Sequence, residues 1–192
     1  MTETKWNFIE NDKFDEWYEM KAKNMEIVKS KVYPFLDSII LKSSELGCEK
    51  PPQSALIIEP TKYETQLIVS EWFDEHPEIS TYTWPANTVQ HTCSHVVDGK
   101  EVSFYFGEKD IENINKQNQV LIIEMFGMTD KPARKHLLSL VKDKFVMSPL
   151  GVEINMDKVG FILAISYPDS HFGYEALSES DISAFDCVLR LD

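Results

Sequence analysis

The chain has 192 residues, 43% of them hydrophobic, which is enough to bury the core of one domain. Acidic residues outnumber lysine and arginine by 32 to 19, and the formal charge of −13 argues against a broad surface for nucleic acid or anionic lipid. The apolar runs are too short to cross a bilayer, and the acidic N-terminus lacks the apolar segment of a secretory signal. The three cysteines are far apart and indicate no disulfide framework. We therefore expect a cytoplasmic protein with no membrane or nucleic-acid partner.

The first part of the chain predicts a long helix, then a strand, a second helix and a second strand. Apolar residues recur at spacings of three and four over 12–46, where Pro34 is expected to bend or split the helix. A continuous apolar run predicts a buried strand at 55–58, and helical spacing resumes at 64–76. The alternating residues 79–85 predict the second strand.

The middle of the chain contains a hairpin signal. The segments 89–97 and 100–106 alternate between apolar and polar residues on either side of Asp98-Gly99, a dipeptide typical of a two-residue hairpin turn. The nearly continuous apolar run at 120–126 is the pattern of a strand buried on both faces of a parallel sheet.

The last third predicts two further helices that alternate with strands. The expected elements are a helix at 130–145, a buried strand at 159–167, a short helix at 178–185 and a closing strand at 187–191. Such alternation predicts an α/β fold with a mainly parallel sheet. We expect a helical segment at 1–50 and the α/β core at 51–192.

Four stretches resemble MoxR-type AAA+ ATPases, and their order and spacing along the chain match that family. "VLIIEMFGMTDKPARKHLLSLVKDKFV" (120–146) is similar to the Walker B strand and the helix after it, and "VGFILAISYPDSHFGYEALSESDISAFDCVLRLD" (159–192) is similar to the sensor-1 strand and its sequel. "ALIIEPTKYETQL" (55–67) lies where that family has its P-loop, and the hairpin "VVDGKEVSFYFG" lies where relatives carry an insert. The resemblance implies the three-layer α/β core of a P-loop NTPase, with a β-hairpin insert, an N-terminal helical segment and no helical lid domain.

The resemblance also implies that the phosphate site is degenerate. A P-loop uses glycines to bring backbone N–H groups to the phosphates, a lysine to neutralise charge and a hydroxyl to hold magnesium. The matching region carries instead Glu59, Pro60, Lys62, Glu64, Thr65 and Gln66. One like-charge pair at about 4 Å costs roughly 4 kcal/mol at an effective dielectric near 20, so carboxylates here oppose polyphosphate binding.

Other positions of the family mechanism differ as well. The Walker B acidic pair is Glu124-Met125, the sensor-1 asparagine position falls at Tyr167, and the arginine-finger position falls at Ala184. Glu124 can hold a magnesium ion, whereas Met125 cannot polarise a water molecule. An arginine finger alone contributes about 10³–10⁵ in rate, so these losses together predict an inactive pseudo-ATPase.

Two functions follow from these differences. The first is an AAA+-like protein that needs no cofactor and acts through protein partners. It would be a structural or assembly-helper subunit, or a partner or decoy of an active AAA+ ATPase. The alternative is a divergent ATPase that binds ATP and magnesium with Lys62 and Glu124 in altered roles. The frequent Lys, Asn, Ile and Glu residues are compatible with a viral or mobile-element origin, and the sequence favours neither a monomer nor a ring.

One predicted strand carries a candidate metal site. His91, Cys93 and His95 alternate along it, and imidazole and thiolate ligands suit zinc. Alternate positions on a strand are about 7 Å apart, so three in a row chelate poorly. We expect an ordinary strand and no metal.

The predicted N-terminal helix carries a candidate interaction surface. Phe14, Trp17 and Tyr18 lie among acidic residues, and large aromatic residues are typical of protein interfaces. Packing of this helix onto the core is the alternative reading of the same residues.

Overall fold

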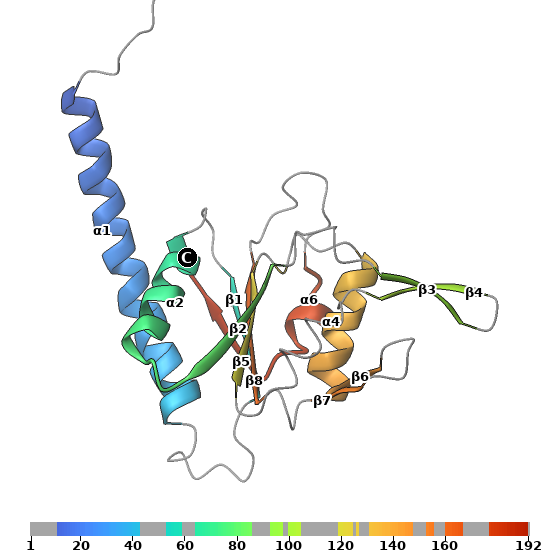
Figure 1. Cartoon of the computed structure of the whole chain (residues 1–192). Helices are drawn as coiled ribbons and strands as arrows, with labels where there is room; N and C mark the ends of the chain where they lie inside the picture. The colour runs from blue at the N-terminus through green and yellow to red at the C-terminus, as the bar shows by residue number, and fades with distance from the viewer. Residues whose placement is uncertain are drawn as a thin grey trace, which may run out of the picture.

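A five-stranded, all-parallel sheet forms the centre of the computed structural model (Figure 1). The structure describes residues 11–42, 53–58, 64–85, 93–97, 100–104, 119–124, 126, 131–147, 153–155, 160–166 and 177–191. The strand order is β2-β5-β8-β1-β9. The strands are β1 (Ser54–Ile58), β2 (Ser80–Pro85), β5 (Gln119–Glu124), β8 (Phe161–Ser166) and β9 (Cys187–Arg190). This confirms the predicted parallel sheet.

The three central strands are buried on both faces. Every residue of β1 and of β8 is buried, and so are the four apolar residues of β5 from Val120 to Ile123. Their sequences are continuous apolar runs because neither face of these strands meets water. The predicted strands at 55–58, 120–126 and 159–167 are therefore confirmed, each within three residues of its observed ends.

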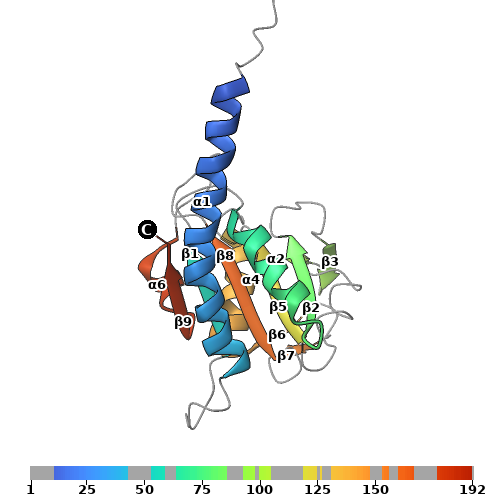
Figure 2. The same cartoon turned by 90° about the vertical axis from the view of Figure 1, so that its left-hand side faces the viewer.

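Helices cover both faces of the sheet (Figure 2). One face is covered by α1 (Asn11–Leu36), its π-helical continuation η1 (Asp37–Leu41) and α2 (Glu64–Glu75). The other face is covered by α4 (Lys131–Asp143) and the short α6 (Glu179–Ile182), whose neighbours Phe126 and Phe185 complete that core. Among the helices within the described ranges, none combines the length and the apolar composition needed to cross a membrane.

Helix α1 continues through Pro34 and does not split there. The chain changes to π-helical geometry three residues later, where Asp37 begins η1. The Asp37 carboxylate accepts a hydrogen bond of 3.0 Å from the indole N–H of Trp72 on α2, and Trp72 is fully buried. The C-terminal part of the long helix is thereby fixed to the helix that follows β1, as expected if this segment packs onto the core.

Two hairpins lie outside the main sheet. The strands β3 (Cys93–Val97) and β4 (Lys100–Phe104) pair antiparallel across the Asp98-Gly99 turn position, which confirms the predicted hairpin insert. The strands β6 (Phe145–Met147) and β7 (Glu153–Asn155) form a second pair that we did not predict. Three-residue strands are too short to show alternation.

A carboxylate joins the amino ends of β1 and β9. Asp186 accepts hydrogen bonds of 2.9 Å from the Gln53 backbone N–H and from the Ser54 hydroxyl, and it lies 3.6 Å from the Lys144 ammonium. Burial alone would raise the pKa of Asp186, but the two hydrogen bonds and Lys144 together lower it.

We expect Asp186→Asn to lower stability in a pH-dependent way. Because the pKa of Asp186 is lowered in the folded state, its contribution is present above the ordinary value of 3.8 and is lost as pH falls through the folded value. Urea midpoints of wild type and variant should therefore differ at neutral pH and converge below pH 3.8. A difference that stays constant with pH would contradict this role.

We expect Trp72→Phe to lower the free energy of unfolding by about 2 kcal/mol, since it removes buried volume and leaves Asp37 without the indole donor. Urea denaturation measures this change. Leu67→Ala on the same helix is the control, because Leu67 is 57% exposed and its loss should change stability by less than about 0.5 kcal/mol. Equal changes in the two variants would contradict the proposed anchoring.

Candidate functional site

The carboxyl ends of the central strands form the candidate site. Open α/β sheets bind ligands beyond these ends, at the strand where the strand order reverses. That strand is β1. The chain passes from β1 to β2 at one edge of the sheet, and its last strand, β9, lies on the opposite side of β1. Ile58 pairs with Ser166 and with Arg190, and Glu124 ends the strand beyond β8. Residues from four strand ends therefore meet at one edge.

Three of the predicted P-loop positions lie in the first turn of α2. Thr65 is fully buried, and Glu64 and Gln66 are half-buried. The remaining positions of that set lie outside the described residues, namely Glu59, Pro60 and Lys62. The residue at the predicted lysine position, Thr65, thus has a short, uncharged and buried side chain.

The charge at the start of α2 is also unsuitable for a phosphate. The first turn of a helix carries a partial positive charge, which binds anions. Glu64 places its own carboxylate in this turn, which stabilises the helix by about 0.3–1 kcal/mol in typical cases. The same carboxylate neutralises the potential that would attract a phosphate group.

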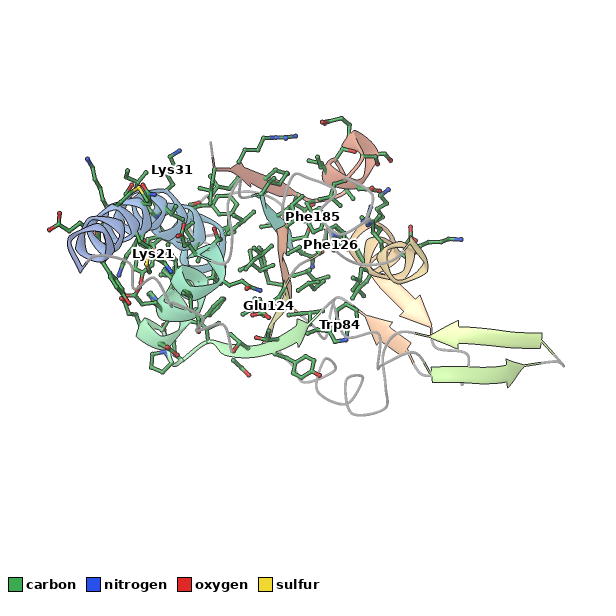
Figure 3. All side chains as sticks on the ribbon, turned by 90° about the horizontal axis from the view of Figure 1, so that it is seen from above. Lys21, Lys31, Trp84, Glu124, Phe126 and Phe185 are labelled. Carbon is green, nitrogen blue, oxygen red and sulfur yellow. The ribbon has the colours of Figure 1, made fainter. Side chains whose placement is uncertain are left out.

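Glu124 is the acidic residue of the sheet edge. It is half-buried at the end of β5, and burial raises the pKa of its carboxyl. Figure 3 shows Glu124 near the middle of the sheet, while Phe126 and Phe185 pack edge to face at 5.5 Å in the core beside α4. Met125, its neighbour in the predicted Walker B pair, lies outside the described residues. One carboxylate of this kind can act as a magnesium ligand but supplies no second acidic group.

Metal binding by a cluster of side chains has no support in the described part of the chain. No group of three or more His, Cys, Asp or Glu residues positioned to hold a metal ion occurs there. Cys93 and His95 lie on β3 opposite Phe104 and Val102, and His91 is outside the described residues. The zinc candidate therefore stays untested.

The chain contains two arginines, and we did not consider either as a site residue from the sequence. Arg134 is buried in α4. Arg190 ends β9 opposite Ile58, half exposed, with its guanidinium 3.6 Å from the Glu179 carboxylate. The sequence contained one signal for Arg190, since it is a basic residue at the end of the last predicted strand. Parallel sheets carry their ligand-binding groups at this end of the strands.

The position predicted for the arginine finger faces the core of its own chain. Ala184 is half-buried and packs against the cluster that contains Phe126 and Phe185. The sensor-1 position, Tyr167, lies outside the described residues.

The candidate interaction surface lies on α1. Tyr18 is 54% exposed there, and Phe14 and Trp17 belong to the same helix.

The arrangement of the elements is similar to that of the RuvB protein of Thermotoga maritima. One mutant form of that protein aligns with 88% of this chain at a TM-score of 0.51 and 17% sequence identity, and a second variant aligns with 85% at 0.50 and 16%. This chain spans about half the length of these proteins, 46% and 45% respectively. No protein-family model and no curated protein sequence matches the chain.

The likeness to RuvB shows the fold alone. It confirms the predicted α/β architecture, in which helices cover both faces of the parallel sheet. The narrower MoxR-type assignment and the loss of catalytic residues stay predictions, because identities of 16–17% carry no information about the site.

We expect Glu124→Gln to stabilise the protein at neutral pH. A raised pKa means that the folded state favours the neutral carboxyl, so this contribution is present below the ordinary value of 4.5 and is lost as pH rises through the folded value. Thermal midpoints of wild type and variant should coincide below pH 4.5 and separate above it, with the variant higher. A lower midpoint for the variant at neutral pH would show that the ionised carboxylate has a favourable partner.

Proposed function

We propose that this chain is a catalytically inactive AAA+-like protein that acts by binding other proteins. One observation carries the proposal. Glu64 and the buried Thr65 lie at the start of α2, where the resemblance to the family motif calls for a glycine and a lysine. This supports a P-loop ATPase scaffold whose motif lysine has been replaced.

The electrostatics of the sheet edge support this proposal. Glu124 and the end of β1 are separated by β8, so their backbones are two strand spacings, or about 10 Å, apart. This is slightly more than the Debye length of about 8 Å at physiological salt, so an ionised Glu124 is partly screened and opposes a triphosphate beyond β1 only weakly. Arg190, the arginine at this edge, already pairs with a carboxylate.

The proposed partners are proteins of the cytoplasm. An intact fold without nucleotide chemistry suits a structural or assembly-helper subunit, or a partner or decoy that docks on an active AAA+ ATPase. No nucleic acid, membrane or cofactor is part of this proposal. The net charge of −13 is consistent with the exclusion of nucleic acid and anionic lipid.

A second function is favoured by the raised pKa of Glu124. Perturbed carboxylates at a strand end are frequent in active sites. In this alternative, Glu124 would hold magnesium, and Lys62 with Arg190 would supply the cations for ATP. Arg190 lies directly opposite Ile58, the last residue before the predicted P-loop region.

Isothermal titration with Mg-ATP and Mg-ADP separates the two functions. We expect no binding heat at millimolar nucleotide, because the edge repels the phosphates. Micromolar binding that is weakened at least tenfold by both Glu124→Gln and Arg190→Gln would overturn the proposal and support the divergent ATPase. Lys142→Gln is the control, since this exposed lysine lies in the last turn of α4.

A further inference from the structure

Helix α1 carries a heptad pattern that is longer than the part of the helix that packs onto the domain. Residues spaced alternately by four and three form one continuous seam: Phe14, Tyr18, Lys21, Met25, Val28, Val32, Phe35 and Ile39. This spacing places all of them along one face of a helix and is the repeat of coiled coils. Lys21 is the one charged residue in the seam.

The C-terminal half of the seam is used inside the domain. Val32 and Ile39 are buried, and Met25, Val28 and Phe35 pack against the same core cluster. Ion pairing adds to this contact, since the Lys29 ammonium lies 2.7 Å from the Glu71 carboxylate of α2. This half of α1 therefore has its partner within the chain.

The N-terminal half of α1 projects beyond the other described elements, as both views show (Figures 1 and 2). Tyr18 is 54% exposed, and Met20 and Ile27 are 56% and 49% exposed. Of these, Tyr18 continues the seam, whereas Met20 and Ile27 lie on another face of the helix. An exposed aromatic residue that continues a buried seam is consistent with a surface for a partner. A groove of about 400 Å³ lies where the seam leaves the domain. Its lining combines the apolar Ala22, Met25 and Ile68 with the charged Lys23, Glu26, Lys29 and Glu71.

The charges of α1 are divided along its length. Residues 12–19 contain four acidic residues and one lysine, a net charge of −3. Residues 21–31 contain four lysines and one glutamate, a net charge of +3. Lys29 already pairs with Glu71, and the lysines near the projecting half are Lys21 and Lys23. A parallel copy would bring like charges together, whereas an antiparallel copy places Lys21 and Lys23 near the acidic residues at 12–19.

We propose that α1 pairs in antiparallel orientation with the α1 of a second copy of this chain. In an antiparallel pair, each seam residue of one helix faces a seam residue of the other helix. One register of this kind pairs only residues of the projecting half. It places Phe14 against Met25 of the second copy and Tyr18 against Lys21 of the second copy, each twice by the two-fold symmetry. Tyr18 and Lys21 then form a cation–π contact, which accommodates the charged seam residue within the interface.

This register also accounts for the groove. Phe14 of the second copy arrives beside Met25, which lines the groove together with Ile68. In this register the aromatic residue packs against the apolar part of that lining, Met25 and Ile68. The inference does not depend on the proposed function, because the pairing requires neither the loss nor the presence of nucleotide binding.

Light scattering after size exclusion tests the association. We expect a mass of about twice 22.2 kDa, and a dimer that weakens at high salt. The variants Lys21→Glu/Lys23→Glu and Asp15→Lys/Glu19→Lys should each weaken it at least tenfold, because each makes α1 uniform in sign. Their equimolar mixture should restore a dimer. Lys135→Glu/Lys142→Glu is the matched control, since both lysines are exposed on α4.

A monomeric wild type at millimolar concentration would overturn the inference, and so would charge variants that dimerise as strongly as wild type. Circular dichroism of each variant confirms that its fold is retained. The mixing step keeps the test decisive, because two misfolded variants would not recover a dimer when they are combined.

Thiol cross-linking tests the orientation. In a background with Cys48, Cys93 and Cys187 replaced by serine, a short bifunctional thiol reagent should join Phe14→Cys to Met25→Cys in a mixture. Phe14→Cys alone should give little product, because the two copies of residue 14 are about 16 Å apart along the axis of the antiparallel pair. Efficient product from Phe14→Cys alone would indicate a parallel pair and would contradict the proposed register.

Discussion

The parallel pairing of β5, β8 and β1, buried on both faces, determines the rest of this structure. Parallel neighbours cannot be joined by a tight turn, so each connection must cross over the sheet, and the helices in those connections cover its two faces. The same pairing brings all carboxyl ends to one edge. The location of the candidate site is therefore a consequence of strand direction, whatever chemistry that site retains.

The fold and the phosphate chemistry depend on different residues, so one can be kept while the other is lost. The sheet needs the apolar volume of residues such as Leu56 and Ile162, which are fully buried. Phosphate binding by a P-loop needs glycine and lysine, and the resemblance to that motif predicts that Glu64 and Thr65 take these positions at the start of α2. Replacement of these residues costs the fold little, because an acidic residue in the first turn of a helix is itself favourable.

Most of the sheet could be predicted from the sequence because buried parallel strands read as unbroken apolar runs, as in 55–58 and 159–167. The hairpin β3–β4 could be predicted from its Asp-Gly turn. The pair β6–β7 could not, since Lys144, which directly follows α4, has a φ of 59°, a conformation usually taken by glycine, and so gave no signal. At the site, the position of Glu124 followed from its strand, but Arg190 was missed because the order of strands, with β9 beside β1, is set by tertiary packing.

Strand β9 forms one margin of the sheet, and among the described strands it pairs with β1 alone. Its outer backbone groups are therefore a template on which another extended chain could add, and such margins favour aggregation. Charged residues stand at both ends of this strand, with Asp186 before it and Arg190 at its close. Charges in these positions disfavour the stacking of sheets edge to edge, so the same side chains that fasten β9 also act as gatekeepers for the folded protein.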